Sequence, residues 1–254
     1  NLINSLKRKY GSTLTAVVAF GDEARAKLQR LEQREIELSR LNGEIHALDA
    51  KIVRAGQELS TRRRKLIPEL STAVNRHLAE LGFRQSHFDI LLSANNPEEA
   101  IENGAKSMSH GFDTVEFQFA PNTGEPPRPL RAIASSGELA RVMLALKTVL
   151  AAEDQVPVLV FDEVDANVGG ETANAVAEKM QQIAKKHQVL CITHLPQVAA
   201  PASAHYVATK QTKDGRTISR IDLLERDERV DELARMLGGG SEAARRHAES
   251  LLAI

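Results

Sequence analysis

Two adjacent carboxylates, Asp162 and Glu163, directly follow the apolar run VLVF at residues 158–161. A β-branched run of this kind is typical of a parallel strand buried on both faces. In α/β proteins the carboxyl edge of a parallel sheet binds ligands. In nucleotide hydrolases the first carboxylate of such a pair holds Mg²⁺ and the second deprotonates the attacking water. Taken alone, the pattern is more often a solvated acidic turn.

A second candidate site is the sequence SSGEL at residues 135–139, directly before a helical apolar pattern. Ser135 or Ser136 is a suitable helix cap, and Gly137 permits close approach of another backbone. The positive end of the helix attracts an anion. These features suit a phosphate group, although an ordinary capped helix start uses the same residues.

The third candidate is His194, which follows the apolar run VLCIT at residues 189–193. If the two apolar runs are neighbouring strands, this imidazole lies close enough to bond a phosphate held at the same sheet edge. A lone histidine at a strand end usually has a structural role. The three motifs in this order are much more specific than any one of them.

The elements expected to position these motifs form an α/β domain. After Pro68, strands alternate with helices, which favours a mostly parallel sheet flanked by helices. The predicted strands are 88–92, 115–119, 156–161 and 189–193, with a hairpin over 205–224 that turns at Asp214 and Gly215; the predicted helices are 69–82, 138–153, 172–186, 229–237 and 241–254.

The first quarter of the chain has the pattern of a coiled coil. Apolar residues recur at intervals of seven, at Leu31, Leu38, Ile45, Ile52, Leu59 and Leu66. This spacing predicts one long helix, capped near Gly11 by Ser12 or Thr13, whose seam needs a partner helix. We therefore expect residues 1–66 to form a coiled-coil arm and residues 67–254 to form a globular segment. The partner helix comes from another chain or from a segment outside these residues.

Charge is unevenly distributed along the chain. Residues 1–66 carry 14 Lys and Arg against 8 Asp and Glu, although the whole chain has a net charge of −1. The basic runs 7–9 and 62–65 suit contact with DNA phosphates, or else are solvated helix faces. The single cysteine excludes a multi-cysteine metal site, and few aromatic residues are available to stack on nucleobases. The sequence has no apolar membrane span, so we expect a cytoplasmic protein.

The three motifs, separated by about 20 and about 30 residues, resemble the C-terminal part of an ABC-type ATPase head. They match its signature motif, its Walker B strand and its switch histidine, and Asp165 matches the D-loop. Within this superfamily the chain is similar to the RecN family of bacterial SMC-like ATPases of DNA double-strand-break repair. Further matching segments, over essentially the whole chain, are 6–11, 111–117, 122–125, 193–199, 205–206 with Lys210, and 229–238.

The resemblance implies a role for each site residue. Asp162 would support Mg²⁺, Glu163 would be the general base and His194 would sense the γ-phosphate. Asp165 would couple two sites. The ATP held by an opposing head would contact the signature residues Ser135, Ser136, Gly137 and Glu138. ATP binding and hydrolysis between paired heads would then drive DNA tethering in the bacterial nucleoid.

Two departures from the family pattern qualify this interpretation. Ser136 stands where the superfamily signature has glycine, and the sequence contains no Gly-x-x-x-x-Gly-Lys-Ser/Thr loop. We therefore expect a C-terminal half whose partners are an N-terminal half carrying that Walker A loop, a second head and DNA. Alone it is expected to be inactive. The alternatives are a nucleotide-incompetent coiled-coil interaction module, or a chromosome scaffold of another SMC type.

Overall fold

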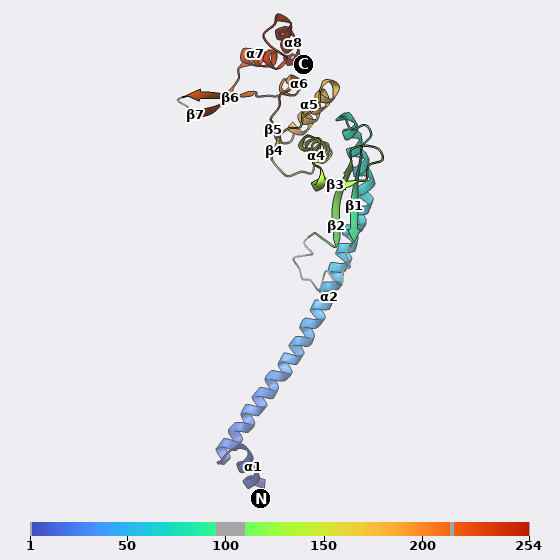
Figure 1. The fold of residues 1–254 in the computed structure, drawn as a ribbon. Coiled ribbons are helices and arrows are strands. Elements are labelled where there is room, and N and C mark those ends of the chain that lie inside the picture. The colour runs from blue at the N-terminus through green and yellow to red at the C-terminus, as the bar shows by residue number, and fades with distance from the viewer. Residues whose placement is uncertain (1, 95–109, 214–215, 254) are drawn as a thin grey trace. The chain divides into compact units, whose positions relative to one another are not determined.

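The computed structural model describes residues 2–94, 110–213 and 216–253 (Figure 1). The chain divides into two compact units. The first contains Asn1–Arg62 and Ala94–Asp113, and the second contains Arg63–Ser93 and Thr114–Ile254. Both units draw on one long helix, α2 (Leu14–Glu80), which confirms the long helix predicted from the heptad pattern.

The first unit begins with a short helix, α1 (Leu2–Tyr10), and a turn at Gly11, whose φ is +153°. Thr13 Oγ1 accepts a hydrogen bond from the backbone amide of Ala16 at 3.1 Å, so Thr13 caps α2. The rings of Tyr10 and Phe20 lie 4.9 Å apart and join the two helices.

The heptad seam of α2 is open to solvent in this chain. Leu31, Leu38, Ile45 and Leu48 each expose between 53% and 56% of their surface. A row of large apolar side chains this exposed is typical of a surface that a partner covers. The exposed seam supports the prediction that another helix pairs with this arm, and that pairing stays a prediction.

Phe112 and Asp113 contact α2 within the first unit. The Phe112 ring occupies the space beside Gly56, where an added Cβ would lie 2.1 Å from the Phe112 Cε2 atom. One turn further along the helix, Ser60 Oγ donates to Asp113 Oδ1 at 2.6 Å, and both residues are buried. Gly56 is therefore required by the close approach of an aromatic ring.

In the second unit α2 continues through Pro68, whereas the sequence predicted a separate helix from residue 69. A proline inside a helix removes one backbone donor and costs about 3 kcal/mol. After Pro68 the helix buries Val74 and Leu78 completely in the core. Core burial outweighs the local cost, so the helix is continuous and that predicted boundary was wrong.

The second unit contains most of the three small sheets (Figure 1). The first sheet has three strands in the order β1 (His87–Ala94), β2 (Asp113–Ala120) and β3 (Arg128–Pro129), and β2 and β3 are antiparallel. Strands β4 (Val158–Phe161) and β5 (Gln188–Cys191) are parallel. Strands β6 (Tyr206–Lys213) and β7 (Arg216–Leu223) form the predicted antiparallel hairpin. Its predicted turn, Asp214 and Gly215, lies outside the described residues.

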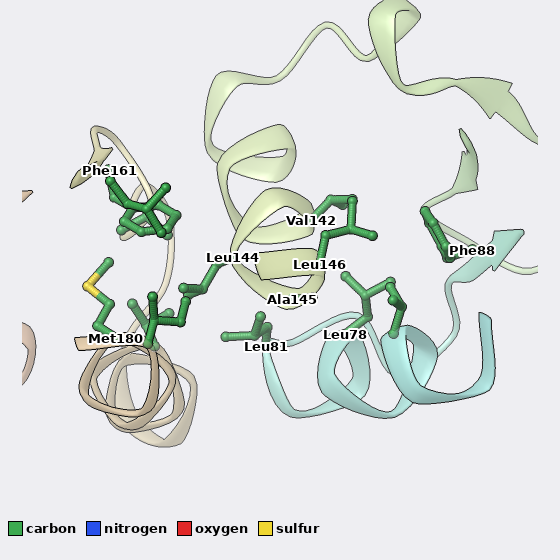
Figure 2. Close-up of a cluster of buried hydrophobic side chains, with 14 of the residues drawn as sticks. Leu78, Leu81, Phe88, Val142, Leu144, Ala145, Leu146, Phe161 and Met180 are labelled. Atoms are coloured by element: carbon green, nitrogen blue, oxygen red, sulfur yellow. The ribbon is translucent and has the colours of Figure 1, made fainter. Parts of the chain in front are cut away.

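The helices of the second unit surround two clusters of buried apolar side chains. Figure 2 shows the main cluster, which contains Leu78 of α2, Leu81 directly after the end of α2, and Met180 of α5 (Gly170–Ala184). The smaller cluster joins α6 (Pro196–Ala199), α7 (Arg226–Met236) and α8 (Glu242–Leu252) through Ala199, Leu233 and Ala248. The elements are η2 (Leu130–Ala132), α4 (Ser136–Leu150), α5 (Gly170–Ala184), α6 (Pro196–Ala199), α7 (Arg226–Met236) and α8 (Glu242–Leu252).

Strand β4 differs from its prediction in one respect. Leu159 and Phe161 are buried against α4 and α5, whereas Val158 and Val160 are 40% and 64% exposed. The sequence predicted burial on both faces. Within the described residues, helices cover only one face of the β4–β5 pair, so its other face is apolar and exposed. The α/β class itself is confirmed.

Candidate nucleotide site at the ends of strands β4 and β5

The carboxyl ends of β4 and β5 lie side by side. Phe161 pairs with Cys191 in the parallel register, and the Ile192 amide donates to the Phe161 carbonyl at 2.9 Å. Asp162 and Glu163 therefore leave the sheet at the same edge as Thr193 and His194. The parallel pairing that the motif order predicted is confirmed.

Asp165 joins the loops that follow these two strands. Its Oδ2 atom accepts hydrogen bonds from the Thr193 hydroxyl and, at 3.0 Å, from the His194 backbone amide. The same oxygen lies 3.2 Å from His194 Nδ1. Asp165 is only 2% exposed, whereas 70% of the His194 side chain is exposed. A buried carboxylate thus orients an imidazole whose Nε2 is the nitrogen left for a ligand.

The loop between β4 and α5 contains two residues with unusual backbone conformations. Glu163 and Asn167 have φ values of +56° and +58°, in the left-handed region that residues other than glycine rarely adopt. Backbone hydrogen bonds from Ala166 to Glu163, and from Val168 to Asp165, close the loop on itself. Such strained residues cluster at functional sites, where the surrounding structure holds them in place.

The first turn of α4 packs directly on this loop. Ser135 caps the helix, because its hydroxyl accepts from the Glu138 amide at 3.3 Å. A Cβ added at Gly137 would lie 2.9 Å from Ala166 Cβ and 3.1 Å from the Glu163 carbonyl oxygen. Gly137 therefore permits the close approach that the sequence predicted. Ser136, the next residue after the cap, donates its hydroxyl to Glu163 Oε2.

Arg141, in the second turn of α4, also holds this helix against the loop after β4. Its Nη1 donates to the Ala166 carbonyl at 2.9 Å, and its guanidinium lies 5.0 Å from the centroid of the Phe83 ring. Burial lowers the pKa of Arg141, and the nearby charge of Glu138 opposes this. Sequence analysis missed this residue; its only signal was an arginine among the apolar positions of a helix.

The charge of the sheet edge also acts on Cys191 at the end of β5. Burial, then the negative charges of Asp165 and Asp162, raise the pKa of its thiol to about 12. Cys191 is therefore a packed strand residue without nucleophilic character at neutral pH.

Asp162 is exposed at this edge and suits Mg²⁺, which prefers carboxylate, phosphate and water oxygens. Among the described residues no cluster of three or more His, Cys, Asp or Glu side chains forms a self-sufficient metal site. An ion at Asp162 would thus need oxygens from a nucleotide and water. The residues fit such an ion, because Mg²⁺ is usually held by one or two carboxylates and by substrate phosphates.

The structure brings most of the predicted site residues together. The backbone amide of Glu138 donates to the Ser135 hydroxyl. Ser136 and Gly137 both contact Glu163, and Asp165 contacts His194. The link between Asp165 and His194 was not predicted, because the sequence assigned Asp165 only to coupling between two sites. Its signal was a carboxylate two residues after the strand-end pair.

Comparison with known proteins identifies relatives along nearly the whole chain. The chain is 43% identical over 252 residues to the DNA repair protein RecN of Deinococcus radiodurans, covering 99% of this chain and 43% of that protein. It is 40% identical over 253 residues to RecN of Treponema pallidum, with 99% and 44% covered. The RecN protein of Bacillus subtilis is 36% identical over 260 residues, with 99% and 45% covered.

The chain belongs to the RecN family. It spans less than half the length of these curated relatives. No family model matches it. Its fold is similar to the Smc head domain with a coiled coil and joint from Pyrococcus yayanosii, with a TM-score of 0.54 at 19% identity, covering 94% of this chain and 39% of that structure. RecN membership agrees with the resemblance of the three motifs, and the structural likeness supports the head-and-arm fold.

Proposed function

We propose that this chain forms the C-terminal half of a RecN-type ATPase that acts in DNA double-strand-break repair. The observation that carries the proposal is the convergence of Asp162, Glu163 and His194 at one parallel sheet edge, with His194 oriented by buried Asp165. This arrangement suits the terminal phosphate of ATP. The relatives named above are DNA repair proteins, which supports the role in repair.

Each residue at this edge has a distinct task in the proposed reaction. Asp162 would hold Mg²⁺, which when bound neutralises charge on the phosphates. Glu163 orients the attacking water and takes its proton. His194 reaches the γ-phosphate through Nε2, while Asp165 holds Nδ1 at 3.2 Å.

The start of α4 would bind the nucleotide that an opposing head holds. The backbone amides at its start and its positive end suit a γ-phosphate, with Ser136, Gly137 and Glu138 in the first turn after the cap Ser135. ATP binding would close two heads around two nucleotides, and hydrolysis would release them. Asp165 would couple the two sites. This cycle would tether DNA.

The proposed partners follow from what these residues lack and expose. The sequence has no Gly-x-x-x-x-Gly-Lys-Ser/Thr loop, so a segment carrying one would complete each nucleotide site. We propose that residues 1–66 form the returning coiled-coil arm and residues 67–254 the head segment. None of the described helices has the length and apolarity that a membrane crossing requires.

For DNA we propose contacts from the basic runs 7–9 and 62–65. Arg8, Lys9, Arg62 and Arg64 are exposed, and Arg62 pairs with Glu58 at 2.6 Å. Such contacts neutralise phosphates without reading sequence. Reversing the charges of residues 62–65 in the full-length protein should flatten the salt dependence of DNA binding, while an unchanged slope would remove this run from the interface.

The ATPase proposal is tested by Glu163→Gln in the full-length protein. This variant keeps the size of the side chain but removes the base, so we expect ATP-bound, dimeric heads that do not turn over. Light scattering after size exclusion, with ATP and Mg²⁺, measures the dimer. Asp162→Ala is the matched control, because loss of the Mg²⁺ ligand should prevent the ATP-dependent dimer. Normal turnover by Glu163→Gln would remove Glu163 from the mechanism.

A second function, a coiled-coil interaction module without turnover, is favoured for this chain by itself. The observation is the missing phosphate loop combined with the exposed seam at Leu31, Leu38 and Ile45. The chain alone should hydrolyse no ATP, and addition of the segment that carries the loop should restore hydrolysis. Hydrolysis by the chain alone would contradict this assignment.

A further inference from the structure

We propose that Ser136 restrains Glu163 in the nucleotide-free head, and that engagement of a second head breaks this restraint. The inference rests on the proposed function, in which Glu163 is the general base. It assigns Ser136 as a positioning residue that ties catalysis to head pairing. The observation is the hydrogen bond that the Ser136 hydroxyl donates to Glu163 Oε2 within one chain.

The bond depends on the residue type at position 136. The ABC-type signature that this motif resembles has glycine there, and glycine has no hydroxyl to donate. In this chain the serine occupies the first helical position after the cap Ser135, so its hydroxyl is not used to cap the helix. Its recorded partner is the carboxylate of Glu163, 27 residues later in the sequence.

The backbones on both sides of this bond are held in place. Gly137 is buried against Ala166 and the Glu163 carbonyl, and Arg141 bonds the Ala166 carbonyl at 2.9 Å. Glu163 itself adopts a left-handed backbone with φ of +56°. The two side chains are exposed, but they extend from backbones that are packed against each other. Their contact is therefore a defined geometry of the head.

The chemistry of a hydroxyl makes the restraint a switch. A serine hydroxyl has one hydrogen, so Ser136 donates either to Glu163 or to a phosphate, but never to both. In the proposed paired heads, α4 faces the nucleotide of the opposing head. A phosphate oxygen there accepts the hydrogen bond from the Ser136 hydroxyl. Glu163 then has no bond to Ser136 and can accept a proton from water. Pairing thereby releases the base.

The first test uses no hydrolysis. Hydrogen exchange of residues 162–168 is measured in the nucleotide-free, full-length protein for Ser136→Ala, Glu163→Ala and the double variant. Ser136→Ala should speed exchange of this loop several-fold, and should add nothing once Glu163→Ala is present. Ser241→Ala, which removes the cap of the distant helix α8, is the matched control and should leave the loop unchanged.

The second test measures turnover. Ser136→Gly should raise kcat several-fold with little change in KM, because no hydroxyl then restrains Glu163. Ser136→Thr, which keeps the hydroxyl, should keep the slow loop exchange of the parent. Loop exchange insensitive to Ser136→Ala, or a kcat that Ser136→Gly leaves unchanged or lowers, would overturn the inference. If Glu163→Gln turns over normally, the proposed function itself fails; if that variant is inactive while Ser136 variants behave as the parent, only this inference fails.

Discussion

Asp165 and His194 form the contact that fixes the candidate site: Asp165 Oδ2 lies 3.2 Å from the imidazole Nδ1 and 3.0 Å from the backbone amide of the same histidine. One buried oxygen thus holds both the ring and the backbone of His194. The Thr193 hydroxyl donates to the same oxygen. The loops after β4 and β5 are therefore joined by a single carboxylate.

Replacing Asp165 with asparagine should disturb both stability and turnover. If the NH₂ group of the new asparagine faces His194, it meets the backbone N–H of that histidine, which is also a donor. The buried hydrogen bonds are then lost, at a cost of about 1–3 kcal/mol. We expect Asp165→Asn to lower the free energy of urea unfolding by that amount and to reduce kcat in the full-length protein. Glu153→Gln, on an exposed turn after α4, is the control. Parent-like stability of Asp165→Ala, which leaves no side-chain oxygen at this position, would show that Oδ2 does not join the loops.

The close approach of α4 to the loop predicts a steric effect at Gly137. A Cβ there would lie 2.9 Å from Ala166 Cβ, so Gly137→Ala must push the helix start away from the loop. Overpacking of this kind costs about 1–3 kcal/mol. Thermal unfolding should show the loss, whereas Gly240→Ala, where an added Cβ has open space, should not. Equal stability of both variants would contradict the packing described for α4.

The partly buried histidines His77 and His205 should make the fold less stable as pH falls. Burial, then Lys179, lowers the pKa of His77; burial, then Arg229, lowers the pKa of His205. Both are neutral in the fold and gain protons more readily when unfolded. Their contribution is complete above the ordinary histidine value of about 6.5 and is lost as pH falls below it.

The free energy of unfolding should therefore be steady between pH 7 and 8 and decline from about pH 6.5 to 5. A further decline is expected below the ordinary glutamate value of about 4.5, because the hydrogen bond from Lys179 lowers the pKa of Glu80. His77→Gln should flatten the upper part of this profile. A profile that rises toward pH 5 would contradict the lowered pKa values of these two histidines.

The environment of Cys191 predicts slow reaction with thiol reagents. With its pKa raised to about 12, only about one thiol in 10⁴ is ionised at pH 8. Iodoacetamide should label the folded chain far more slowly than the chain unfolded in urea, which is the internal control. Equal labelling rates would show that the end of β5 is open to solvent and that the described packing is wrong.

Local patterns in the sequence predicted the elements of the site, but not the contacts that complete it. The runs before Asp162 and His194 are apolar and β-branched, so their pairing followed from the rules of parallel sheets. The loop contacts of Arg141 and the bond between Ser136 and Glu163 depend on how α4 packs on a loop distant in sequence. Periodicity carries no information on such contacts.

The two errors of prediction have a common physical cause. A separate helix was expected from residue 69, and the strand ending at Phe161 was expected to be buried on both faces. In the structure, burial of Val74 and Leu78 keeps the helix continuous. Val158 and Val160 are exposed because, in the part of the chain that the structure describes, helices cover only one face of β4. In both cases the outcome depends on which neighbouring elements are present, and a local pattern does not contain that information.

In the proposed function, ATP binds at the sheet edge formed by the carboxyl ends of β4 and β5. The most direct measurement is a structure of the full-length protein with Mg²⁺ and a non-hydrolysable ATP analogue. We predict that Mg²⁺ lies at Asp162, and that the γ-phosphate lies within hydrogen-bond distance of His194 Nε2 while Asp165 keeps its contact with Nδ1. A nucleotide bound away from this edge, in contact with neither Asp162 nor His194, would contradict the proposed nucleotide site.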